Sequence, residues 1–290
     1  MSLPRVFVLG AGRAGRGLAA ALRSAGVPLA GLHGRRAEPD AALPVSAGAV
    51  APHLPNADVA LLAVRDAQID EAVRELLAAD PPATLILLHA SGGVEPAAYR
   101  DARARGHACG TFHPLLPLAD PSDAARLFRG AWVGIDGDAA ARTASQRLAR
   151  ALGASTLEIP DERALYHAGA VLASNFLGVL GAVAAEAMHA AGVPADEAKT
   201  ATRSLLLAAA DNLGARDAAE VITGPIARGD ARTVRAHLEA LAPYPFLDEI
   251  YRALSRHAIA LARSRGVPGE AIGEIERLIG STVAPNSGRA

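Results

Sequence analysis

Residues 8–17 read VLGAGRAGRG, and this stretch decides the fold. It ends the apolar run 5–10, which is typical of a strand, and it opens a helical pattern over about 14–25. The spacing G-x-G-x-x-G between a strand and a helix indicates a dinucleotide site, because the glycines permit a tight turn, close approach of a pyrophosphate and close helix packing. A helix start offers free N–H groups to the anion. A glycine-rich turn without a ligand is the alternative. The residues expected at the nucleotide are Gly10, Ala11, Gly12, Arg13, Ala14 and Gly15.

Short apolar runs alternate with helical patterns through the first half of the chain. Further strands are predicted at 28–33, 58–64, 83–90, 107–113, 131–136 and 155–160, with a weak one around 43–50, and helices at 66–79 and 138–152. This rhythm predicts an α/β fold with a doubly wound, mostly parallel sheet. After residue 160 only helical patterns follow. We therefore predict a Rossmann nucleotide-binding domain over 1–158, an all-α domain over 159–282 and a disordered tail over 283–290.

The composition excludes several classes of protein. The net charge is −1, and no basic stripe with interleaved aromatic residues suggests nucleic-acid binding. The single cysteine, Cys109, excludes an intramolecular disulfide and a multi-cysteine metal site, so we expect no metal and a reducing, cytoplasmic location. The longest uncharged run, 168–185, contains Ser174, Asn175 and three glycines. It predicts a helix buried within protein, and no membrane span.

The segment after the second predicted strand bears on the choice of nucleotide. NAD sites place Asp or Glu there, against a ribose hydroxyl. Here the segment contains Gly34, Arg35 and Arg36, and Glu38 comes later than expected. The planar fork of arginine suits a 2′-phosphate. We therefore expect NADP, with NAD less favoured; solvated loop arginines are the alternative.

Seven segments together resemble a known family: GAGRAG, LLAVRDAQI, LLHASGG, GTFHPLLPL, WVGIDGD, YHAGAVLASNF and TGPIARGD. The chain resembles bacterial Rossmann-like proteins classed as NADP oxidoreductases, whose first domain is similar to deazaflavin-dependent NADP reductases and whose helical domain has no assigned function. The resemblance implies a fold like that of the phosphogluconate dehydrogenase, pyrroline-carboxylate reductase and prephenate dehydrogenase group. In that group the helical domain commonly forms a homodimer and closes the active site.

The same resemblance implies roles for particular residues. Val64 and Arg65 would line the cofactor, and Ser91 would lie near the nicotinamide. His113 matches a histidine that contacts the substrate hydroxyl, and Asn175 matches an asparagine on the interdomain helix. The catalytic lysine four positions before that asparagine is absent here, because the position holds Val171.

Histidines are the leading candidates for proton transfer, because their pKa lies near neutrality. His113 precedes Pro114 at the end of a predicted strand, where doubly wound folds bind ligands. His89 also ends a strand, and we favour a hydrogen-bonded core histidine there. His167 and Asn175 are two helical turns apart and would share one face. A buried, hydrogen-bonded asparagine is the alternative for Asn175.

The segment 223–230, TGPIARGD, allows two interpretations. Thr223 and Arg228 could bind the substrate, with Arg228 holding a carboxylate. Alternatively, the segment is a turn in which Asp230 caps the next helix.

The sequence thus predicts an NADP-dependent oxidoreductase for a small carbonyl, imine or hydroxyacid bound at an interdomain cleft. His113 would be the acid/base, with His167 and Asn175 orienting the substrate. The alternative is a non-catalytic NADP(H)-binding regulator, which the missing lysine favours.

Overall fold

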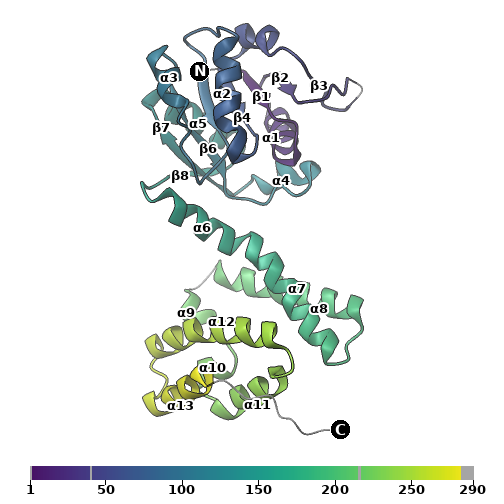
Figure 1. Cartoon of the computed structure of the whole chain (residues 1–290), viewed down its shortest axis with the longest axis vertical. Coiled ribbons are helices and arrows are strands. Elements are labelled where there is room, and N and C mark those ends of the chain that lie inside the picture. Colours follow the sequence, from purple (N-terminus) through teal and green to yellow (C-terminus); the bar gives the residue numbers. More distant parts are fainter. Residues whose placement is uncertain (1, 40, 215–216, 282–290) are drawn as a thin grey trace. The chain divides into compact units, whose positions relative to one another are not determined.

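The computed structural model describes residues 2–39, 41–214 and 217–281 (Figure 1). The chain forms two compact units, residues 1–176 and residues 177–290. The last strand ends at Glu158, where the sequence-based boundary was drawn, but the following helix groups with the sheet. The predicted tail 283–290 lies outside the described residues.

The first unit contains an eight-stranded sheet with the order β3-β2-β1-β4-β5-β6-β7-β8. β1 to β6 are parallel, β7 is antiparallel to β6, and β8 is parallel to β7. This order confirms the predicted α/β class with a doubly wound, mostly parallel sheet. The strands are β1 Val6–Leu9, β2 Leu29–His33, β3 Val45–Ser46, β4 Val59–Leu62, β5 Ile86–His89, β6 Cys109–Pro114, β7 Trp132–Gly137 and β8 Ser155–Glu158.

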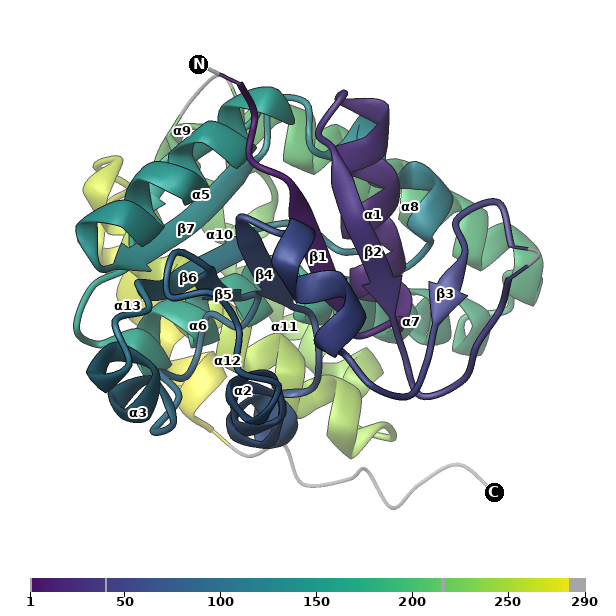
Figure 2. The ribbon, with the colours of Figure 1, turned by 90° about the horizontal axis from the view of Figure 1, so that it is seen from above.

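Helices cover both faces of this sheet. Because successive strand residues point to opposite faces, Val6 and Val8 pack in one core and Phe7 and Leu9 in the other. The first core includes α1 (Arg13–Ser24), α4 (Ala124–Leu127) and α5 (Ala139–Ala151), and the second includes α2 (Ile69–Ala78) and α3 (Tyr99–Ala104). Figure 2 shows β1 and β2 side by side, with α1 running along them. Short 3₁₀ helices occur at η1 Ala51–Asn56, η2 Asp66–Gln68 and η3 Pro121–Asp123.

The parallel order brings distant parts of the sequence to one edge of the sheet. The carboxyl ends of β1, β2, β4, β5 and β6 all meet there, since these strands run in the same direction. Pro114 is the last residue of β6 and pairs with Val133. The strand stops at this proline, as predicted. His113 therefore lies at the same edge as the glycine-rich loop after β1.

A long apolar helix follows the sheet, and it is broken once. α6 (Arg163–Ala173) ends before Ser174, and α7 (Asn175–Ala190) begins directly after it. The span Arg163–Ala190 is long and apolar enough to cross a membrane, by length and composition only. Only 6% of its most apolar window is buried within the chain. The expected burial of this helix within protein therefore stays a prediction.

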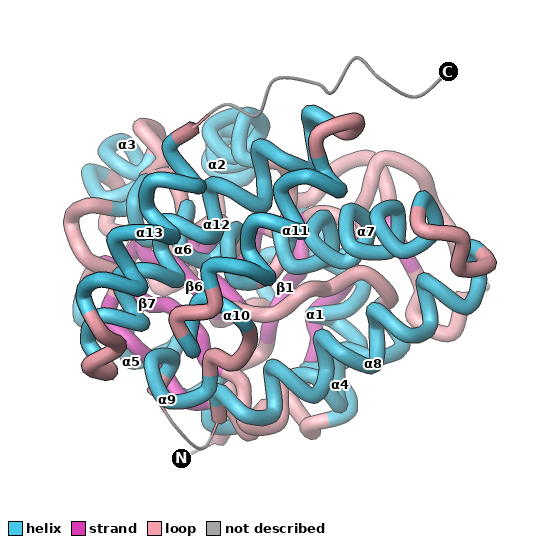
Figure 3. Tube along the Cα trace, turned by 90° about the horizontal axis from the view of Figure 1, so that it is seen from below, coloured by secondary structure: helices cyan, strands magenta, loops and turns pink. Residues whose placement is uncertain are grey.

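The second unit consists of helices and connecting loops in its described residues (Figure 3). Its core lies among the last four helices and includes Val234, Leu238, Ile259, Ile272 and Ile275. α7 and α8 contribute little to it, because their buried residues are only Ala185, Ala198 and Thr202. The remaining helices are α8 Ala195–Leu213, α9 Ala218–Val221, α10 Pro225–Arg228, α11 Ala231–Leu241, α12 Pro245–Ser264 and α13 Gly269–Gly280.

Candidate active site

The glycine-rich loop contains glycines that the fold requires and one that it does not. Gly10 has φ +115°, and a Cβ there would lie 2.4 Å from the Ala63 oxygen. A Cβ on Gly15 would lie 1.7 Å from the Gly10 oxygen. Gly12 has an ordinary extended backbone and nothing within 4 Å of such a Cβ. Packing therefore explains Gly10 and Gly15, whereas Gly12 faces open space at the start of α1.

The start of α1 is suited to an anion. No side chain caps the helix, and no acidic residue lies in its first turn. The first N–H groups of a helix have no partner within it, and they lie at the positive end of the helix dipole. With the space at Gly12, these donors could hold a dinucleotide phosphate. Ala11, Arg13 and Ala14 belong to the same turn and first helical residues.

The segment after β2 packs directly against this loop. A Cβ on Gly34 would lie 2.7 Å from the Ala11 Cβ, so the two loops are in close contact. Arg35 and Arg36 follow and are exposed. Glu38 is paired: its Oε1 accepts a 2.7 Å hydrogen bond from Arg16 Nη2. The two arginines thus belong to a segment that adjoins the glycine loop. A 2′-phosphate would be expected at this position.

Two more predicted cofactor positions lie at the same sheet edge. Val64 follows β4, and its Cγ1 would be 3.1 Å from a Cβ on Gly10. Arg65 is exposed beside it. Ser91 is buried after β5, and its Oγ accepts a 3.3 Å hydrogen bond from the Gly93 N–H. Ser91 therefore shapes the loop after β5.

His113 lies at this edge in a cluster of aromatic and polar side chains. Its Nδ1 is 2.9 Å from the Tyr166 hydroxyl, and its ring centroid is 5.8 Å from that of His167. Gly92 packs against the His113 ring, since a Cβ there would lie 2.5 Å from it. Gly134 pairs with His113 across the sheet and makes room for the phenol, because its Cβ would lie 2.2 Å from the Tyr166 oxygen.

Burial sets the charge states within this cluster. The pKa of His113 is lowered to about 4, mainly by burial and in part by His167, while Asp66 opposes the shift. Burial raises the pKa of Tyr166 to about 12, against the influence of Arg163. At neutral pH His113 is a neutral imidazole and Tyr166 a protonated phenol. The pair therefore shares one hydrogen bond without a net charge.

A second polar interaction attaches the start of α6 to the sheet. Arg163 forms an ion pair with Asp136 of β7, and its Nη1 is 3.5 Å from the Val94 oxygen. Both charged side chains are largely buried, at 15% and 23% exposure. Because Arg163 is three residues before Tyr166, this ion pair positions the helical turn that carries the phenol and His167.

His89 has the core role that the sequence favoured. It is fully buried, and burial lowers its pKa to about 3. Its Nδ1 accepts a 3.2 Å hydrogen bond from the Ser91 N–H, so its Nε2–H donates to Thr111 Oγ1 at 3.1 Å. His89 holds the loop after β5 in place.

Among the residues that the structure describes, no hydrogen bond or ring contact joins Asn175 to the His113 cluster. It is exposed, and no hydrogen bond of its side chain is found within the described part of the chain. The break at Ser174 separates it from the helix that carries His167. The shared helical face expected for His167 and Asn175 is therefore interrupted. The buried, hydrogen-bonded asparagine considered as an alternative is not observed.

The segment 223–230 belongs to the second unit, and there the capping interpretation is correct. Asp230 Oδ1 accepts a 3.0 Å hydrogen bond from the Thr233 N–H at the start of α11. Thr223 and Arg228 are both exposed. Their proposed contact with substrate stays a prediction.

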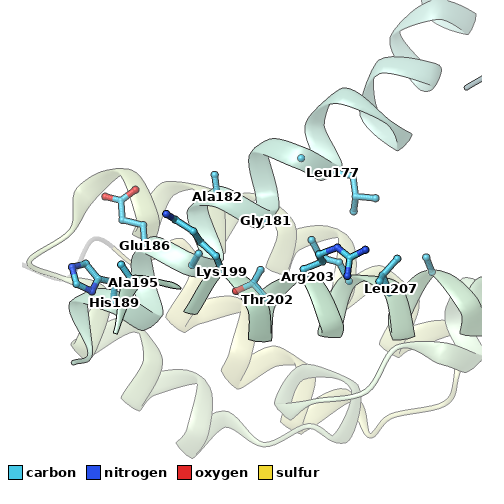
Figure 4. Close-up of a pocket in the computed structure, with 14 residues that line it drawn as sticks. Leu177, Gly181, Ala182, Glu186, His189, Ala195, Lys199, Thr202, Arg203 and Leu207 are labelled. Atoms are coloured by element: carbon cyan, nitrogen blue, oxygen red, sulfur yellow. The ribbon is translucent and has the colours of Figure 1, made fainter. Parts of the chain in front are cut away.

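The second unit also contains an apolar groove of about 760 Å³ between α7 and α8 (Figure 4). At Gly181 the helices approach closely, since a Cβ there would lie 2.9 Å from Leu206 Cδ1. Leu177, Ala182 and Leu207 contribute apolar surface. The charged and polar lining residues are Glu186, His189, Lys199, Thr202 and Arg203.

Sequence reasoning missed Tyr166 and Arg163. Tyr166 directly precedes His167, and consecutive helical residues point about 100° apart, so periodicity does not group the two side chains. Across the strand pair, however, Gly134 opens space for the phenol, a signal that only the register of β6 and β7 could provide. Among the described residues no group of three His, Cys, Asp or Glu side chains could hold a metal ion.

Comparisons with known proteins support this architecture. Residues 131–258 match the model of a family described as a domain of unknown function, DUF2520. No curated protein matches the chain. The solved structures that share the fold at low sequence identity include the following three.

The first is a Bacteroides fragilis protein provisionally classed as an NADP oxidoreductase, with 18% identity and TM-score 0.65, covering 90% of this chain and 97% of that one. A Thermotoga maritima protein has 19% identity and TM-score 0.69, covering 90% and 99%. Pyrroline carboxylate reductase from Plasmodium falciparum, solved with NADP bound, has 12% identity and TM-score 0.62, covering 95% and 99%. The chain therefore has the fold of Rossmann-type reductases with a helical second part.

Proposed function

We propose that this chain is an NADP(H)-dependent oxidoreductase that acts on a small carbonyl, imine or hydroxyacid. The observation that carries the proposal is the His113–Tyr166 hydrogen bond at the carboxyl end of β6, on the same sheet edge as the glycine-rich loop. Proteins of this fold include an NADP-bound pyrroline carboxylate reductase, which supports NADP as the cofactor. The predicted interdomain cleft and cytoplasmic location are part of the proposal.

The residues present fit a dinucleotide. The uncapped start of α1 and the open space at Gly12 would hold the pyrophosphate, and Arg35 and Arg36 would hold a 2′-phosphate. A bound nicotinamide supplies or accepts the hydride. The protein must then supply one proton acceptor or donor near the reacting oxygen or nitrogen.

The neutral His113–Tyr166 pair provides that group. With Nδ1 of His113 unprotonated, the Tyr166 O–H donates to it. When a substrate hydroxyl gives its proton to the phenol oxygen, the phenol proton passes to Nδ1, and His113 becomes an imidazolium. In the reductive direction the steps run in reverse: His113 first takes up a proton, which then passes through Tyr166 to the substrate oxygen or nitrogen. His167 lies beside His113 and would orient the substrate.

The proposal is tested by nucleotide binding and turnover. NADPH and NADH binding is measured by fluorescence, and activity is screened with small hydroxyacids, ketoacids, ketones and cyclic imines. We expect Tyr166→Phe and His113→Asn each to lower kcat by about a hundredfold or more, with NADPH affinity unchanged. Loss in His113→Asn with full activity in Tyr166→Phe would show that His113 acts without the relay. Unchanged activity in both would remove the pair from the reaction.

The alternative is a regulator that binds NADP(H) without turnover. It is favoured by the absence of a lysine at Val171. Tight NADPH binding with no activity over the whole panel would support it. Failure to bind either nucleotide would contradict both functions.

We also propose that a second copy of this chain covers the groove between α7 and α8. Leu205, Leu207 and Leu213 on α8 are between 50% and 61% exposed, as is Val179 on α7 at 51%. An exposed apolar patch of this kind commonly marks a contact with another protein surface. Charges of both signs, Glu186 against Lys199 and Arg203, lie around the groove. Such a face suits a two-fold contact, in which each copy presents the same residues to the other.

A further inference from the structure

The ion pair between Arg16 and Glu38 lies where the two nucleotide-contacting segments meet. Arg16 belongs to α1, and its Nε donates a 2.9 Å hydrogen bond to the Ala11 oxygen in the glycine loop. Its Nη2 donates to Glu38 Oε1 at 2.7 Å, in the segment after β2. One guanidinium thus contacts both the loop expected at the pyrophosphate and the segment expected at the ribose.

Hydrogen bonds hold the backbone of Glu38 in place. Its backbone pairs with Val45 through two hydrogen bonds, of 2.9 and 3.1 Å. Farther along the same connection, the Ala42 oxygen accepts a 2.6 Å hydrogen bond from Arg23 Nη1, also from α1. The segment is therefore attached to α1 at two places. Glu38 meets Arg16 through a backbone that is itself fixed.

Glu38 is the acidic residue closest in sequence to the position that carries Asp or Glu in NAD sites. A free carboxylate there would accept a hydrogen bond from a ribose 2′-hydroxyl and would repel a 2′-phosphate. Paired with Arg16, its charge is compensated. Arg35 and Arg36 are exposed in that segment, and no ion pair joins either of them to another residue within 2–39 or 41–214.

We infer that Arg16 determines nucleotide specificity by neutralising Glu38, so that the segment after β2 selects the 2′-phosphate of NADP(H). This inference rests on the proposed function, because it concerns the same nucleotide site. Arg35 and Arg36 would bind the phosphate itself, whereas the preference for NADP(H) over NAD(H) is here assigned to a residue of α1. Arg16 is here a specificity-determining residue and takes no part in the proton transfer.

Two single variants distinguish charge neutralisation by Arg16 from a purely structural role of the ion pair. Arg16→Gln leaves a free carboxylate and should lower the ratio Kd(NADH)/Kd(NADPH) by about fivefold. Glu38→Gln removes the carboxylate and should leave the ratio unchanged or raise it. In the double variant R16Q/E38Q the ratio should recover most of the loss. If the ion pair only holds the loops together, both single variants break it, and the ratio shifts in the same direction in both.

The experiment measures both dissociation constants by fluorescence titration for the wild type and the three variants. Arg142→Gln is the matched control, because it breaks the 2.9 Å ion pair with Glu158 at a similar exposure away from the glycine loop. Shifts of equal sign in the two single variants, or no recovery in the double variant, would overturn the inference while nucleotide binding still supports the proposed function. A wild type that binds neither nucleotide would overturn both.

Discussion

At the scale of single residues, the candidate site depends on glycines that let side chains pack directly against the backbone. Gly92 and Gly134 leave room for the His113 ring and the Tyr166 hydroxyl. Gly12 is different, because no neighbouring atom requires a glycine there. An ordinary glycine-rich turn needs glycine only where φ is positive or where neighbouring atoms leave no space for a side chain. A glycine at the open position 12 is instead what a phosphate site would need.

This difference predicts opposite effects of one substitution on folding and binding. In Gly12→Asp the new side chain is a good helix N-cap and suits the positive end of α1, so the melting temperature should stay equal or rise. The carboxylate would occupy the space expected for a phosphate, and NADPH affinity should fall by about tenfold or more. Thermal unfolding and fluorescence titration measure the two effects.

The control for this substitution is Gly269→Asp at the start of α13, where a Cβ also meets nothing within 4 Å. It should leave NADPH binding unchanged. Wild-type affinity in Gly12→Asp would show that the loop is a turn without a phosphate.

At the scale of elements, adjacent strands β5 and β6 carry two neutral histidines, of which His89 is fully buried and His113 is half-buried. His89 has a pKa of about 3 and His113 of about 4, both lowered mainly by burial. In the unfolded chain each returns to about 6.5. Between pH 6.5 and 4 the unfolded state therefore binds more protons than the folded state. Acidification through this range removes stability that is fully present above pH 6.5.

We expect the free energy of unfolding to fall by about 1.4 kcal/mol per pH unit for each of these protons below pH 6. Urea denaturation at pH 7, 6 and 5 measures this slope. In His113→Gln one titrating group is lost, so this slope should be smaller by about 1.4 kcal/mol per pH unit. His257→Gln, on the exposed surface of α12, reports the effect of losing an imidazole elsewhere. The same slope in His113→Gln and the wild type would contradict the low pKa of His113.

At the scale of the whole molecule, the feature that one chain does not explain is the exposed apolar surface of α7 and α8. Within one chain these helices bury few residues, and the large apolar side chains of α8 stay exposed. A second copy would cover them, whereas the last four helices already share a core of their own. The two parts of the helical unit therefore differ in what stabilises them.

We expect the wild type to be a dimer in solution and Leu207→Glu to shift it toward a monomer, because a buried charge without a partner opposes association. Light scattering after size-exclusion chromatography measures the mass. Leu254→Glu is the control, since Leu254 is similarly exposed, at 51%, but lies on α12 outside the groove. A monomeric wild type, or a dimer unaffected by Leu207→Glu, would contradict the proposed contact.

The doubly wound sheet, the glycine-rich loop and the position of His113 at a strand end could all be predicted from the amino-acid sequence. These features follow from local signals: apolar runs, glycine spacing, and a proline that ends a strand. Three features became visible only in the folded chain: Tyr166 contacts His113, Ser174 interrupts the helix before Asn175, and Arg16 pairs with Glu38. Each of these depends on side chains brought together from distant segments or on a local break in backbone geometry. Periodicity along the chain contains neither kind of information.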